Sequence, residues 1–149
     1  MNERHTIVSR EMGSLMVTVY SQNEPSDPDW DDHLEHLIRH YHRWGPSSRR
    51  LSWALGGVAN ASQRARLVRL MGPNRGRGAV LTSSPLVRGV MTALSWFSQD
   101  MRCFQPDHLC DALMFLQRDP QDAKRVKEVL LGLCRDLGLP SSKALEVRI

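Results

Sequence analysis

The chain has 149 residues, of which 41% are hydrophobic and 24% are charged, a balance typical of one soluble globular domain. Its formal net charge of +4 permits an anionic partner without requiring one. The longest apolar stretch, residues 86–97, is too short to cross a bilayer, and no secretory signal begins the chain. We therefore expect a cytoplasmic protein that does not insert into membranes.

Two strands and a helix are predicted at the start of the chain. Residues 5–10 and 15–21 are predicted strands, the second with Leu15, Val17 and Val19 alternating with other side chains, and the short segment around Gly13 suits a hairpin. This pair of strands should therefore be antiparallel. The following helix is predicted to begin at Asp27, as its N-cap, and to end at Gly45.

The rest of the chain alternates between strands and helices. We predict strands over 50–55, 78–82 and 101–104, and helices over 62–71, 85–97, 106–116 and 119–138. Only a connection as long as a helix joins neighbouring parallel strands, so this alternation indicates a mainly parallel sheet. The predicted fold is a single α/β domain with a mixed, mostly parallel sheet of four to five strands. An N-terminal β-hairpin, flanking helices and an extra C-terminal helix complete it.

Two segments show a pattern found in a known family. Residues 86–97, LVRGVMTALSWF, precede residues 101–116, MRCFQPDHLCDALMFL, in which a short strand ends at Phe104 and a helix has Ala112 and Leu116 on its core face. Together with the N-terminal hairpin, this order resembles the STAS domain superfamily, and more narrowly its SpoIIAA-like branch. The resemblance covers about residues 4–118. Residues 119–138 would add a helix packed on that domain, and residues 139–149 a flexible tail.

The resemblance implies a regulatory domain that binds a protein partner or a second copy of itself, without catalysis. Anti-sigma-factor antagonists of this fold present a serine at the start of their second helix, and a partner kinase phosphorylates it. The matching position here is Ser62. The aspartate and paired serines of that pattern are absent, and GVANA, residues 57–61, stands in their place. We therefore expect docking without a phosphoserine switch.

The turn before residues 62–71 also suits a small anion. Ser62 or Asn60 would cap the helix, because their side-chain oxygens accept hydrogen bonds from backbone N–H groups. The same helix end, next to Gly57, would attract an anion such as a lipid head group or nucleotide, with Arg64 or Arg88 as the counter-charge. Capping and anion binding remain open alternatives for Ser62, and anion binding is the alternative function.

The helix over residues 86–97 is apolar over more of its surface than one buried face requires. Met91, Trp96 and Phe97 do not fit the same inward stripe as the other apolar residues. Methionine and aromatic residues are enriched in interface cores. We therefore predict that either the extra C-terminal helix or a partner surface covers these three residues.

His33, His36 and His40 recur at a spacing that places them in one sector of the first helix. Three imidazoles in that arrangement would suit zinc, but we interpret them as a solvated flank and predict no metal site. The chain has no GxSxG elbow and no phosphate-binding loop with a lysine, so we expect neither catalysis nor a cofactor. The NRGRG loop at residues 74–78 lacks aromatic residues for base stacking, and we expect no nucleic-acid partner.

Overall fold

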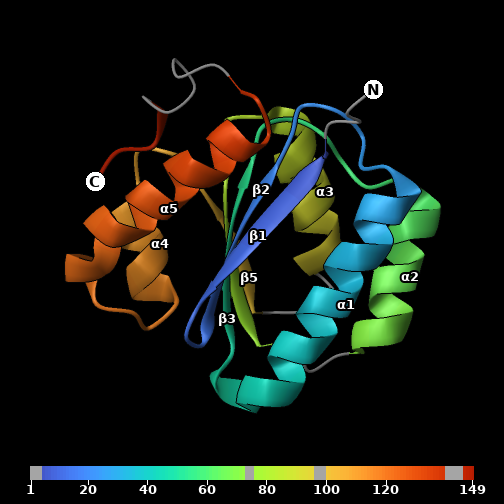
Figure 1. Cartoon of the computed structure of the whole chain (residues 1–149), viewed down its shortest axis with the longest axis horizontal. Helices are drawn as coiled ribbons and strands as arrows, with labels where there is room; N and C mark the ends of the chain where they lie inside the picture. The colour runs from blue at the N-terminus through green and yellow to red at the C-terminus, as the bar shows by residue number, and fades with distance from the viewer. Residues whose placement is uncertain (1–4, 73–75, 96–99, 140–145) are drawn as a thin grey trace.

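The computed structural model describes residues 5–72, 76–95, 100–139 and 146–149 (Figure 1). These residues form a single α/β domain around one five-stranded sheet. The strands are β1 (Ile7–Met12), β2 (Leu15–Tyr20), β3 (Arg49–Ala54), β4 (Arg77–Leu81) and β5 (Met101–Phe104). The helices are α1 (Asp27–Trp44), α2 (Ala61–Met71), α3 (Pro85–Ser95), α4 (Leu109–Phe115) and α5 (Ala123–Asp136), with short 3₁₀ turns η1 (Gly45–Ser47) and η2 (Pro120–Asp122).

The sheet has the order β1-β2-β3-β4-β5, so each strand lies beside its neighbours in sequence. β1 pairs antiparallel with β2, and all the other pairs are parallel. This arrangement confirms the predicted fold class. Because parallel crossovers share one handedness, successive connections place α1, α2 and α3 on the same face of the sheet. Helices α4 and α5 cover the opposite face (Figure 1).

Four predicted helix starts differ from the structure by one to four residues, and α2 begins at Ala61, one residue before the predicted start. Ser26, one residue before the predicted Asp27, caps α1 and accepts a hydrogen bond from a backbone N–H in its first turn. Helix α4 begins at Leu109, after a turn that follows Pro106. Helix α5 begins at Ala123, because the capped segment before it forms the 3₁₀ turn η2. At each start a capping side chain or a local turn satisfies backbone N–H groups of the first turn.

The two faces of the sheet differ in chemistry. The face toward α4 and α5 is apolar and holds the main core, which includes Val17, Leu51, Trp53 and Leu81. The face toward α1, α2 and α3 also has polar side chains, namely Thr18, Tyr20, Arg50 and Ser52. Side chains alternate between the two faces along each strand, so β2 and β3 contribute to both. The polar side chains therefore lie beneath helices α1 to α3.

The C-terminal segment packs against the domain on the α4 side. Helix α5 ends at Asp136, and Gly138 just after it adopts a positive φ of 71° and donates its N–H to the carbonyl of Arg135 in the last turn. Further on, Val147 is fully buried in the main core. The N–H of Arg148 donates to the carbonyl of Pro106, and its own carbonyl accepts from Leu109. The end of the predicted tail is thus anchored beside the start of α4.

Candidate functional site

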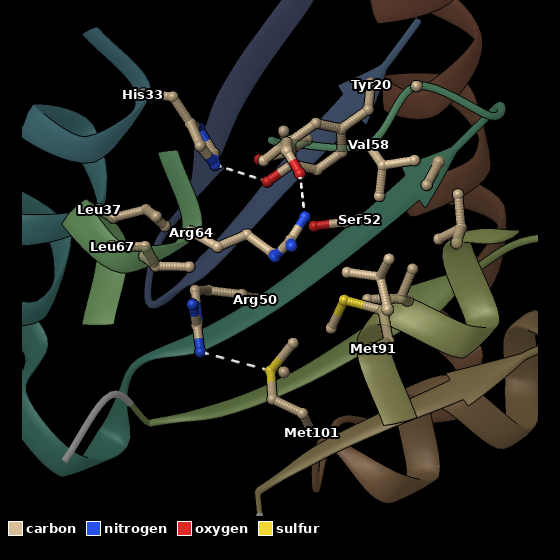
Figure 2. A pocket seen from close by; sticks show the side chains of 18 of the residues that line it. Tyr20, His33, Leu37, Arg50, Ser52, Val58, Arg64, Leu67, Met91 and Met101 are labelled. Carbon is tan, nitrogen blue, oxygen red and sulfur yellow. Dashed lines mark hydrogen bonds between the residues drawn. The ribbon is translucent and has the colours of Figure 1, made fainter. Parts of the chain in front are cut away.

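A cavity of about 110 Å³ lies between the polar face of the sheet and helices α1, α2 and α3 (Figure 2). Most of its lining is apolar, with Leu37 from α1, Leu67 from α2 and Met91 from α3. The polar residues Thr18, Tyr20, Arg50 and Ser52 reach it from β2 and β3. An apolar cavity with a few converging polar groups is the usual form of a small-molecule site.

A larger groove of about 590 Å³ runs along the other side of the domain, between the β1–β2 hairpin and α5. Charged residues of both signs line it, including Arg10, Glu11, Arg125 and Glu128. Such mixed charges are typical of a solvated surface. The smaller cavity is therefore the better candidate site.

Tyr20 and His33 form a hydrogen-bonded pair inside the cavity. The Tyr20 Oη and His33 Nε2 atoms are 2.6 Å apart, and the His33 side chain is only 4% exposed. Burial, aided by the positive charge of Arg50, lowers the pKa of His33 to about 3. Burial also raises the pKa of Tyr20 to about 12. Both side chains are therefore uncharged at neutral pH.

Two arginines approach the cavity from different elements. Arg50, from β3, donates from Nη2 to the sulfur of Met101 at 3.5 Å. Arg64, from the first turns of α2, donates from Nη1 to the carbonyl of Ala59 at 2.5 Å. Figure 2 shows the Arg64 guanidinium beside Ser52, whereas the Arg50 guanidinium is directed toward Met101. A guanidinium carries five N–H donors in a planar fork, so it can bind several acceptor atoms at once.

The glycine turn after β3 packs closely against the loop after β2. The N–H of Gly57 donates to the carbonyl of Ser21 at 2.9 Å. A Cβ atom at Gly57 would lie 1.9 Å from the carbonyl oxygen of Asn23. The glycine is thus needed for contact between two loops, and its N–H group already has an acceptor. It borders the cavity without forming a phosphate cradle.

Asn60, and not Ser62, caps helix α2. Its Oδ1 accepts from the N–H of Gln63 at 2.9 Å, while its own N–H donates to Gln63 Oε1 at 2.9 Å. This reciprocal arrangement is a capping box, which satisfies two backbone donors at the helix start. Ser62 is exposed in the first turn. Neither Asn60 nor Ser62 lines the cavity.

Arg88 is separated from the other residues of the predicted anion site. It is exposed on α3 and donates from Nη2 to the carbonyl of Thr82 at 3.4 Å. It does not line the cavity, whereas Arg64 and Gly57 do. The structure therefore brings two of the five predicted residues to one site and places that site beneath the turn, inside the domain.

Of the three predicted interface residues, Met91 lines the cavity and is partly buried. Trp96 and Phe97 lie outside the described residues. Helix α5 packs on β1, β2 and α4, on the opposite face of the sheet from α3. The extra C-terminal helix therefore does not cover α3.

The interpretation of the helix α1 histidines as a solvated flank was wrong for two of them. His40 is 1% exposed, and its Nε2 donates to the Ser14 carbonyl at 2.9 Å while Nδ1 lies 2.8 Å from the Glu11 carboxylate. His33 is buried against Tyr20, and His36 alone of the three is exposed. Within the part of the chain that the structure describes, no three His, Cys, Asp or Glu side chains are grouped to hold a metal ion.

Sequence reasoning did not identify Tyr20, Arg50 or Ser52 as site residues. One pattern pointed to them, because Thr18 and Tyr20 of β2, and Arg50 and Ser52 of β3, are polar residues spaced two positions apart. Thr18 of β2 pairs in register with Ser52 of β3, so the two strands place their polar residues side by side on one face. In a sheet covered on both faces, such a polar strip lies inside the protein.

Comparisons of the chain with protein-family models, with curated proteins and with solved structures found no match. The resemblance to the STAS domain therefore stays a prediction. Among the described residues, no helix combines the length and the apolar character that crossing a membrane requires.

Proposed function

We propose that this domain binds a small, largely apolar molecule in the cavity between the sheet and helices α1 to α3. The observation that supports the proposal is the cavity itself, with its volume of about 110 Å³ and its mostly apolar lining. For comparison, an engineered apolar cavity of about 150 Å³ binds benzene. A molecule with one aromatic ring or a short aliphatic chain is of suitable size.

The chemistry of the lining favours binding over catalysis. A group that exchanges protons during a reaction works best when its pKa lies near the operating pH. The pKa of His33 is about 3 and that of Tyr20 is about 12, so neither is suited to proton transfer at neutral pH. We therefore propose that this pair orients a ligand by hydrogen bonding.

Filling the cavity should abolish binding. Val90 lines the cavity from α3 and is partly buried, so Val90→Phe would place a ring in the space that the ligand needs. We expect the affinity for benzyl alcohol, followed by chemical-shift perturbation in NMR spectra, to fall by at least about tenfold. The matched control is Val68→Phe on the exposed side of α2, which should bind like the wild type.

The wild-type result is decisive for the proposal. Benzyl alcohol should shift the amide resonances of residues around the cavity, such as Ser52 and Ala59, in a saturable manner. Absence of shifts at millimolar concentration, or equal binding by Val90→Phe, would overturn the proposal.

Docking of a second copy is a second candidate, and the exposed side of α3 supports it. Leu86 is 62% exposed, and Gly89 and Ala93 are exposed on the same side of the helix. We expect Leu86→Asp to weaken self-association about tenfold in light scattering after size exclusion. Met114→Asp, at an equally exposed position on α4, should have no effect. A wild-type monomer at every concentration would exclude self-association.

A further inference from the structure

The charged groups that line the cavity are all positive. Among the described lining residues, Arg50 and Arg64 are charged, and none is an aspartate or glutamate. The only other titratable side chains there, Tyr20 and His33, form the uncharged pair described above. The described lining therefore has a net positive charge.

The positive charge acts within the cavity. Arg50 opposes protonation of His33 and favours loss of the Tyr20 proton, so its charge acts to lower the pKa of both groups. Electrostatic interactions are stronger in an apolar enclosure than in water, so an anion placed there would gain more than it would at the surface.

His33 supplies a second, independent indication of a ligand. Its Nε2 atom forms a hydrogen bond with Tyr20. Its Nδ1 atom is buried and has no hydrogen-bond partner among the described residues. The side chain is 4% exposed, so water does not readily reach it. Buried polar atoms are normally paired, so a ligand or an ordered water molecule is the expected partner of this atom.

We propose that the ligand is a small apolar monocarboxylate whose carboxylate is bound at Arg50 and Arg64. This inference rests on the proposed function. A planar carboxylate matches the paired N–H groups of a guanidinium, and the Ser52 hydroxyl, which also lines the cavity, is a further donor. The apolar part of the molecule would then contact the α3 side of the cavity at Met91. A volume of about 110 Å³ is too small to enclose a nucleotide.

Three probes of similar shape test how much the charge of the ligand, apart from its ring, contributes to binding. Benzoate, benzyl alcohol and benzylamine share a ring and differ in charge. Because hydrogen bonds to charged groups are stronger than those between neutral groups, benzoate should bind at least about tenfold more tightly than benzyl alcohol. Benzylamine should bind most weakly of the three. The dissociation constants are measured at pH 7 by NMR titration of the full chain.

The arginine variants locate the anionic group. Arg64→Met should weaken benzoate binding at least about tenfold and change benzyl alcohol binding less than about twofold. The control is Arg66→Met on the same helix, whose guanidinium lies 3.2 Å from Asp31 and does not line the cavity. Arg50→Met is the second variant and should show the same selective loss.

The outcomes distinguish this inference from the proposed function. If benzyl alcohol binds as tightly as benzoate, or if both arginine variants leave benzoate binding unchanged, the carboxylate assignment fails while the cavity remains a binding site. If none of the three probes binds the wild type, the proposed function itself fails.

Discussion

At pH 5 the free energy of unfolding is expected to be about 2 kcal/mol lower than at pH 7, mainly because of His33. The folded protein holds this imidazole neutral, since burial and the Arg50 charge lower its pKa from 6.5 to about 3. In the unfolded chain the same imidazole takes up a proton below pH 6.5. The unfolded state therefore binds more protons between pH 6.5 and pH 3, and stability falls as the pH falls through that window.

Other titrating groups produce smaller or separate effects. Hydrogen bonds from Thr6, His5 and Ser26 outweigh burial and lower the pKa of Asp29, so its stabilising contribution is lost only near and below pH 3.8. The pKa of His5 is raised by its hydrogen bond to Asp29, which gives a contribution of opposite sign. The His5 side chain is 66% exposed, so this contribution is small.

Substitution identifies the source of the pH dependence. His33→Gln keeps an acceptor for the Tyr20 hydroxyl and removes the titrating ring, so the difference between pH 7 and pH 5 should largely disappear. His36→Gln, one turn further along α1 and exposed, should keep the wild-type difference. Urea unfolding at pH 7 and at pH 5, followed by tryptophan fluorescence, measures the free energy of unfolding of both variants. If the His33→Gln variant kept the full pH dependence of stability, another titrating group would be its source.

Gly57→Ala is expected to destabilise the protein by about 3 kcal/mol. The new Cβ atom would lie 1.9 Å from the carbonyl oxygen of Asn23 and 2.7 Å from that of Ser21, both in the backbone of the loop after β2. Backbone atoms cannot move aside as a flexible side chain can. The two loops would have to separate, and the hydrogen bond from the Gly57 N–H to Ser21 would be lost.

Gly89→Ala is the matched control for this change. Gly89 lies in α3, where a methyl group added to its Cα would have open space within 4 Å, and alanine is the better helix former. This substitution should raise stability by about 0.5–1 kcal/mol. Chemical denaturation measures both changes. If Gly57→Ala were as stable as the wild type, the close packing of the two loops would be refuted.

The sequence by itself determined the order of the strands and helices. Alternation at every second residue marks β2, and Pro85 after Ser84 marks the start of α3, because these patterns reflect interactions between near neighbours. The helix-length connections then required parallel pairing of β2 to β5. For the same reason Asn60 was recognised as a possible cap, although the choice between Asn60 and Ser62 needed the backbone geometry of the turn.

Only the tertiary structure decided which side chains form the candidate site. His33 borders the apolar stripe of α1, and whether it faces solvent or the sheet depends on how the helix lies across β2. Its partner Tyr20 is 13 residues away in sequence, and Arg64 enters the same cavity from a different helix. Such contacts form between elements far apart in the chain, so spacing within one element cannot specify them. The sequence thus determined the scaffold, and the packing of α1, α2 and α3 on a partly polar sheet face decided where a ligand would bind.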